Sequence, residues 1–364
     1  MPTCFYPYFY LIFVLYLIKN LFFHCFVILF NNNCQTIIRI IYTSTTFLSD
    51  CILGDLDTME NKKVEDFEIS KNVTIDELTS QYYNAGGFVA KKVGIAVKIL
   101  EQMIDKDCTN FISFPACIIS TGTRGVIKEA IRREYFDVII TTCGTLDHDL
   151  ARVWEDYFHG SFSADDRELH SQGVNRLGNI FIPNSSYGEV LEKNMQPILN
   201  EIVESCGPEL GPREIIYEFG KKIDDEDSIL YWAAKKDIPI YVPGITDGAF
   251  GSQLWMYWQN NKDFSLDMMK DQQELSDIVF PAEETGALMV GGGISKHHTI
   301  WWNQYRGGLD HAVYITTAVE YDGSLSGARV REAVSWGKVR EMADYVTVEG
   351  DATVLLPLIL GKFL

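Results

Sequence analysis

The fold of this chain is constrained most by a series of short apolar runs, each followed by small or polar residues. After residue 110 the chain contains six of them, and we predict a β-strand in each: Phe114 to Ile119, Val138 to Ile140, Ile238 to Val242, Ala287 to Val290, Val313 to Ile315 and Val346 to Val348. Segments with a helical pattern separate most of these runs. Unbroken apolar runs are typical of parallel strands that are buried on both faces. The sequence therefore predicts an α/β fold with a doubly wound, mostly parallel sheet.

Glycine, threonine, serine and aspartate residues follow these runs. Open parallel sheets bind ligands at the carboxyl ends of their strands, and small residues with free backbone amides suit the pyrophosphate of a dinucleotide. The segment Gly291 to Lys296 supplies the first two glycines of a G-x-G-x-x-G motif and has lysine in third place. These features predict a Rossmann-like fold that binds a dinucleotide. Asp247, after the Ile238 run, either forms a turn with Gly248 or binds a ribose hydroxyl.

The region before the first run has helical character. Thr74 and Glu77 form a capping box, and apolar residues recur from Leu78 to Leu100. This pattern predicts one or two packed helices. Gly86 and Gly87 are expected to break or kink them.

The first 58 residues differ in composition from the rest. Residues 5 to 30 are almost all apolar or aromatic, which is long enough to span a bilayer, but they lack the basic start and cleavage site of a secretory signal. After Met59 the sequence becomes an ordinary polar beginning. We expect residues 1–58 to be an upstream extension outside the fold, and residues 59–364 to form a single domain. Mass spectrometry of the native N-terminus tests this expectation.

Charge and cysteine content exclude several classes of function. The net charge of -19 argues against nucleic-acid binding, which needs clustered Lys and Arg. It favours cationic partners such as polyamines or basic proteins, although many acidic proteins are merely soluble. The eight cysteines form no C-x-x-C pair and no zinc-type spacing with histidine. We therefore expect reduced thiols, no metal site and a cytoplasmic protein, with membrane anchoring only if the leader is genuine.

One lysine near the end of the chain has the setting of a reactive amine. Lys338 follows Trp336 closely and lies six residues after Glu332. Burial against an apolar ring disfavours an ammonium and leaves an amine that can form an imine. Most lysines near helix ends are solvated surface groups, so this signal alone is weak.

Two further segments are candidates for the same site. His297 and His298 follow the glycine run; adjacent histidines point in different directions, so a shared metal is not expected. One of them at a strand end can shuttle a proton at an amine nitrogen, and a structural histidine is the alternative. The segment Asp322 to Ala328 reads as a loop that forms a lid or substrate wall. The nearby indoles either pack in the core or hold a cation.

Three motifs together resemble those of deoxyhypusine synthases. Thr141 to Leu150, Gly292 to His298 and Glu332 to Lys338 occur in that family's order and spacing, and the resemblance, closest to the archaeal-type branch, extends from about residue 70 to the end. It implies an NAD-dependent transfer of the aminobutyl group of spermidine. The implied acceptor is one lysine of the precursor of the hypusine-containing translation factor. It also implies a homotetramer with active sites shared across a dimer interface.

The resemblance also implies roles for individual residues. It assigns imine formation to Lys338 and places Glu332, Trp336 and His297 around it as catalytic residues. Its polyamine-binding positions fall on Asp147, His148, Ser252, Gly323, Ser324 and Leu325. Its NAD-binding positions fall on Ser120, Thr142, Cys143, Gly144, Asp247, Gly292, Thr317, Ala318, Asp351 and Ala352.

Three polyamine positions depart from the animal pattern. His148 replaces a glutamate, and Ser252 and Leu325 each replace an aspartate. Desolvated ammonium groups need compensating carboxylates, so the identity of the amine is less secure than the chemistry. Two alternatives stay open: a homospermidine-synthase-like transfer to putrescine, and a non-catalytic regulatory paralogue that binds NAD. The intact residues around Lys338 count against the second.

Overall fold

The computed structural model describes residues 62–106 and 108–364. The expected upstream extension, residues 1–58, lies outside them. Residues 64–364 pack as one compact unit. Within the described part of the chain, no helix has both the length and the apolar character needed to cross a membrane.

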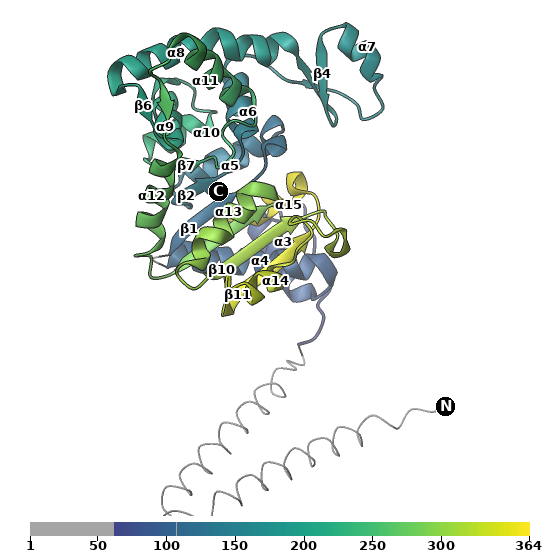
Figure 1. Ribbon diagram of the computed structural model, residues 1–364. Coiled ribbons are helices and arrows are strands. Elements are labelled where there is room, and N and C mark those ends of the chain that lie inside the picture. Colours follow the sequence, from purple (N-terminus) through teal and green to yellow (C-terminus); the bar gives the residue numbers. More distant parts are fainter. Residues whose placement is uncertain (1–61, 107) are drawn as a thin grey trace, which may run out of the picture. The chain divides into compact units, whose positions relative to one another are not determined.

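A six-stranded parallel sheet runs through this unit (Figure 1). Its order is β11-β10-β9-β1-β2-β7, and every neighbouring pair is parallel. This confirms the predicted α/β fold. The strands are β1 (Thr109–Ser113), β2 (Val138–Ile140), β7 (Ile240–Tyr241), β9 (Thr285–Val290), β10 (Leu309–Thr316) and β11 (Val339–Glu349).

The first predicted strand is wrong in position, whereas the other five runs overlap observed strands. β1 ends at Ser113, and Ala116–Ser120 forms a 3-10 helix, η1. Pro115 has no N–H to donate to a sheet ladder, and it precedes η1 as its N-cap. The two isoleucines of η1, Ile118 and Ile119, are buried in the core all the same. An apolar run alone does not distinguish these two cases.

Helices cover both faces of the sheet because alternate strand residues point into different cores. On one face, Leu288 and Val313 pack with α4 (Phe88–Asp105), α5 (Thr123–Arg132) and α15 (Ala352–Leu360). On the other face, Ala287 and Met289 belong to the cluster formed with α12 (Met268–Val279), α13 (Gly293–Gln304) and α14 (Val330–Ser335).

Further helices pack into the core that contains Leu288 and Val313. They are α6 (Cys143–Trp154), α8 (Gly188–Cys206), α9 (Pro212–Lys222), α10 (Ile229–Lys235) and α11 (Ala249–Asn260). At the start of the described chain, α3 (Ile75–Ala85) has the predicted capping box of Thr74 and Glu77 and ends before Gly86. The predictions for this region are confirmed.

A small arm projects from the unit beside α6 and α8 (Figure 1). It consists of an antiparallel sheet in the order β3-β5-β4 and a short helix. The remaining elements are minor. Their bounds are β3 (Phe158–His159), α7 (Asp166–Ser171), β4 (Val174–Leu177), β5 (Ile180–Pro183), η2 (Asn184–Ser186), the parallel pair β6 (Glu209–Leu210) and β8 (Ser265–Leu266), and η3 (Glu320–Asp322).

Candidate active site

The residues predicted to bind the cofactor all follow strands of the central sheet. Because the six strands are parallel, their carboxyl ends meet at one edge. Each strand contributes to this edge: Ser120 follows β1; Thr142, Cys143 and Gly144 follow β2; Asp247 follows β7; Gly292 follows β9; Thr317 and Ala318 follow β10; Asp351 and Ala352 follow β11.

The local geometry of this edge suits a dinucleotide. The helices α6, α13 and α15 begin there, and the first backbone amides of a helix attract anions. Gly292 lies so close to Ser326 that an added Cβ would overlap it. Burial raises the pKa of the Cys143 thiol to about 12. Cys143 is therefore an uncharged packing group.

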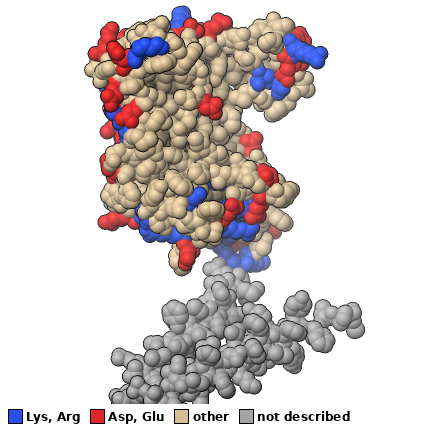
Figure 2. Space-filling model, in the orientation of Figure 1, with Lys and Arg blue, Asp and Glu red and all other residues tan. Residues whose placement is uncertain are grey.

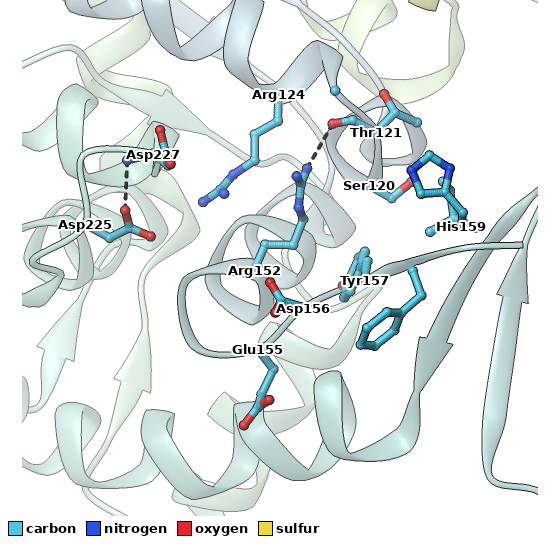
Figure 3. A pocket seen from close by; sticks show the side chains of 13 residues that line it. Ser120, Thr121, Arg124, Arg152, Glu155, Asp156, Tyr157, His159, Asp225 and Asp227 are labelled. Atoms are coloured by element: carbon cyan, nitrogen blue, oxygen red, sulfur yellow. Dashed lines mark hydrogen bonds between the residues drawn. The ribbon is translucent and has the colours of Figure 1, made fainter.

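A polar hollow of about 370 Å³ lies beside Ser120 (Figure 3). Arg152 of α6 donates hydrogen bonds to the carbonyl oxygens of Ile119 and Thr121, at 2.6 and 2.9 Å. Figure 3 shows Arg124 directed away from this segment, and its guanidinium forms a buried ion pair of 2.7 Å with an α6 carboxylate. Arg152 thus fixes the segment that carries Ser120.

A smaller cavity, of about 170 Å³, contains Lys338. The lysine is 8% exposed, and its Nζ lies 5.3 Å from the centroid of the Trp336 ring and 5.6 Å from that of Trp301. Glu332 of α14 lines the same cavity. Trp336 is 63% exposed. The indole therefore stands at the open rim of the cavity, and the lysine lies below it.

The backbone after α14 explains this arrangement. Gly337 has φ +67°, in the left-handed region that glycine adopts at little cost. The N–H groups of Gly337 and Lys338 donate to the carbonyl oxygens of Val334 and Ala333, at 2.9 and 3.0 Å. Such bonds close the end of a helix. They turn the chain from α14 into β11 and place Lys338 immediately before that strand.

The predicted substrate wall lies beside this cavity. Leu325 lines it, whereas Gly323 and Ser324 are exposed. The hydroxyl of Thr316, at the end of β10, donates a hydrogen bond of 2.9 Å to the carbonyl oxygen of Ser326. The wall is therefore attached to the carboxyl edge of the sheet.

The two adjacent histidines have different surroundings. His297 stacks on Trp301 with a centroid distance of 5.6 Å, and partial burial and the charge of Lys338 lower its pKa. His298 Nε2 accepts a hydrogen bond from Trp302, and burial lowers its pKa to about 4. His297 thus faces the candidate site, and His298 is structural. Within residues 62–106 and 108–364, no three His, Cys, Asp or Glu side chains are grouped to hold a metal ion.

Asp147, a predicted polyamine ligand, has a structural role in this chain: its carboxylate binds the first backbone amides of α11. It is 1% exposed, and its carboxylate accepts hydrogen bonds of 2.8 and 2.7 Å from the backbone N–H groups of Ala249 and Phe250. The hydroxyl of Tyr187 donates a third, at 2.8 Å. Asp147 therefore caps the start of α11. Burial raises its pKa, and these bonds oppose that rise.

The neighbouring polyamine positions lack negative charge. His148 Nδ1 lies 2.8 Å from the Tyr157 hydroxyl, and burial lowers the pKa of His148 to about 4. This imidazole is therefore neutral at pH 7. Ser252 is exposed on α11 and lines a hollow of about 540 Å³ together with Glu189 and Glu192.

The predicted residues thus form two groups in one chain. The lysine group contains Lys338, Glu332, Trp336, His297 and the wall, and the α6/α11 group contains Asp147, His148 and Ser252. No hydrogen bond, ion pair or ring contact of the described residues joins the two groups, and no residue lines both of their cavities.

Several polar residues that line these cavities were absent from the predictions. Lys296 and Tyr314 line the cavity of Lys338, and Glu189 lines the hollow at Ser252. A lysine in place of the third glycine of the motif was the one signal for Lys296. The other two have no motif around them.

Comparisons with known proteins agree on one family. The family model described as deoxyhypusine synthase matches residues 77–363. The chain is 53% identical over 310 residues to the "Probable deoxyhypusine synthase" of Picrophilus torridus, covering 85% of this chain and 99% of the relative. It is 52% identical over 304 residues to the protein of the same name from Thermoplasma acidophilum, covering 84% and 98%.

A solved structure supports the fold. The crystal structure of an Entamoeba histolytica protein assigned to the deoxyhypusine synthases superposes with a TM-score of 0.58 at 20% identity, covering 82% of this chain and 96% of that one. The family match extends over most of the chain, and the two archaeal relatives are matched over almost their full length. The chain therefore belongs to the deoxyhypusine synthase family.

Proposed function

We propose that this chain transfers the aminobutyl group of spermidine to a lysine of the precursor of the hypusine-containing translation factor, with NAD as cofactor. The observation that carries this proposal is the cavity in which Lys338 meets Glu332 and two indole rings. Within the described part of the chain, the Lys338 Nζ has no hydrogen-bonding partner. It is therefore free to bond to a substrate carbon.

The side chains of the cavity supply the remaining chemistry. The Lys338 amine attacks the imine carbon of the oxidised amine, 1,3-diaminopropane leaves, and a four-carbon fragment stays on Nζ as an imine. We assign proton transfer to Glu332, which lines the cavity, and to His297, which stacks on Trp301. Because the pKa of His297 is lowered, its imidazole is mostly neutral near pH 7 and can accept a proton. The indole faces attract the ammonium of the substrate.

The carboxyl edge of the sheet is the proposed cofactor site. Thr142, Asp247, Gly292 and Asp351 follow four different strands there, and the exposed Asp247 carboxylate is suited to a ribose hydroxyl. When bound, NAD would accept a hydride from the amine and later return it. The chain would supply backbone amides for the pyrophosphate and small residues that permit its close approach.

We further propose a cytoplasmic homotetramer in which two chains complete each site. The separation of the lysine group from the α6/α11 group supports this. On the face that includes α13, charged side chains are sparse at the centre and gather towards the edges (Figure 2). Ile294, Trp301 and Tyr305, in and just after α13, are exposed. Apolar surface of this kind marks protein contacts.

Covalent trapping tests the central claim. The protein is incubated with labelled spermidine and NAD, reduced with borohydride, digested and analysed by mass spectrometry. We expect the label on Lys338. The variant Lys338→Ala should lose both adduct and transfer but bind NAD with unchanged affinity in calorimetry. Lys222→Ala removes a surface lysine paired with Glu201 and should keep all three. Normal transfer by Lys338→Ala would refute the assignment.

The acceptor needs its own experiment because three polyamine positions lack the carboxylates of the animal pattern. Purified precursor protein and free putrescine are offered separately to enzyme loaded with labelled spermidine. We expect label in the precursor protein. Label in homospermidine alone would instead assign the transfer to putrescine.

A further inference from the structure

A second lysine lies in the same cavity as the proposed nucleophile. Lys296 occupies the first turn of α13, three residues after the start of the helix, and is 1% exposed. It lines the cavity together with Lys338 and Glu332. A buried ammonium is costly unless other groups replace its water.

The contacts of Lys296 replace that water on three sides. Its Nζ donates hydrogen bonds to the carbonyl oxygens of Leu325, at 2.8 Å, and Ala328, at 3.0 Å. It also lies 3.7 Å from the centroid of the Tyr314 ring, whose face attracts a cation. An ammonium has three N–H groups. All three therefore have an acceptor, and Glu332 adds a favourable charge.

These contacts fix the substrate wall. Leu325 and Ala328 stand at the two ends of a short segment that leads into α14, the helix of Glu332. Between them, Ser326 is held by Thr316 and packs against Gly292. Lys296 therefore connects the glycine loop after β9 to the wall on both sides of Ser326.

The two lysine amines differ in whether they are free to attack a substrate. The Lys296 amine donates hydrogen bonds to two carbonyl groups and contacts one aromatic ring. The Lys338 amine has no hydrogen-bonding partner among the described residues. Burial lowers the pKa of Lys296 to about 7, which by itself would suggest a nucleophile. The geometry decides otherwise, because attack by Lys296 would first require both carbonyl bonds to break.

We propose that Lys296 is a positioning residue, which holds the Leu325 to Ala328 wall against Lys338 and so excludes water from the imine formed there. This inference rests on the proposed function. A closed cavity protects hydrolysable intermediates from side reactions.

Loosening the wall has a defined chemical consequence. Water adds to the imine carbon, the C–N bond to Lys338 breaks, and 4-aminobutanal leaves while the lysine regains its free amine. The hydride taken from spermidine then remains as NADH, because no product imine is left to reduce. One aldehyde and one NADH form for each failed transfer.

The ratio of this hydrolysis to aminobutyl transfer tests the proposal. We expect Lys296→Met, which keeps the length but removes the donors, to raise the ratio by about ten-fold or more, as expected from losing hydrogen bonds of a charged group. Lys296→Arg keeps a charged donor and should raise it less. Lys222→Met controls for the loss of a lysine charge. Misfolded protein lowers both products together, so the ratio reports the wall alone.

Hydrogen exchange gives a readout that is independent of activity. Amides of residues 324–328 should exchange faster in Lys296→Met than in the unmodified chain, while those of the β3-β5-β4 arm stay unchanged. If Lys296→Met does not fold, Lys296→Gln takes its place in both measurements. An unchanged ratio with unchanged exchange in a folded variant would overturn the proposal. Absence of any adduct on Lys338 in the unmodified chain would count against the proposed function instead.

Discussion

Ser252 occupies a position where the animal enzymes of the family carry an aspartate. It is exposed in the first turn of α11, where the helix dipole favours a carboxylate. We expect Ser252→Asp to lower the KM for spermidine by about 2- to 5-fold, the effect of one exposed charge pair, with kcat unchanged. Steady-state kinetics at two salt concentrations measures this. Ser252→Asn, similar in size but uncharged, is the control, and an equal gain with Asn would contradict the charge argument.

Tyr314 shows how a polar group can be buried without a partner. Its hydroxyl has no hydrogen-bonding partner among the described residues, while its ring supports Lys296. An unpaired buried hydroxyl costs about 1–3 kcal/mol. We expect Tyr314→Phe to leave the free energy of unfolding unchanged or raise it by about 1 kcal/mol. Urea unfolding measures it, and a loss of more than about 1 kcal/mol would reveal a partner for the hydroxyl.

The spacing of residues along the sequence was sufficient to predict which side chains lie together where the contacts are local. Glu332, Trp336 and Lys338 lie within seven residues, so one helix end brings them together. Lys296 was missed because its partners are backbone carbonyl groups 29 and 32 residues away. The capping role of Asp147 depends on amides more than 100 residues away. Carbonyl and amide groups are present at every residue, so no motif marks these contacts.

At the scale of single elements, Asp271 makes the stability of α12 depend on pH. It lies in the first turn of the helix and is buried. Its carboxylate accepts a hydrogen bond of 3.0 Å from the backbone N–H of Arg213. Burial raises its pKa to about 7, from an ordinary value near 4. Because the folded state holds this proton more tightly than the unfolded chain, the stabilisation is complete below about pH 4 and is lost as the pH rises through about 7.

The variant Asp271→Asn removes this titration. Between pH 4.5 and 8, we expect the free energy of unfolding of the unmodified chain to fall relative to the variant by on the order of 1–3 kcal/mol. Urea unfolding at several pH values measures both proteins. Parallel curves for the two would show that Asp271 ionises normally in the folded protein.

The elements that the sequence predicted best are those with two buried faces. Five of six apolar runs overlap strands, and all their residues except Thr347 are buried. The arm was not predicted, since β3, β4 and β5 have two to four residues and mostly partial or full exposure. Strands so short carry no recognisable period. The strand predicted from Phe114 to Ile119 was wrong for a different reason. Ile118 and Ile119 of the 3-10 helix η1 are buried in the core, so this segment is as apolar as a strand.

At the scale of the whole molecule, no hydrogen bond, ion pair or ring contact of the described residues joins the lysine group to the α6/α11 group. The parallel sheet gathers the proposed cofactor positions at one edge, as its topology requires. The lysine group lies beside α14, whereas the α6/α11 group lies around the start of α11. The sequence cannot reveal this separation, because motif order says nothing about distance. We expect a symmetric dimer in which the lysine group of one chain meets the α6/α11 group of its partner, because two-fold symmetry then forms the same contact twice.

Mixed assemblies test this arrangement. Lys338→Ala and Asp147→Asn should each be nearly inactive alone. When the two chains are co-expressed and assemble at random, half of the dimers are mixed and each mixed dimer contains one intact site. We therefore expect about a quarter of the normal transfer activity in such a two-fold assembly. Co-expression of Lys338→Ala with Glu332→Gln, both in the lysine group, should restore none. If the first mixture is no more active than its separate components, each site is complete within a single chain.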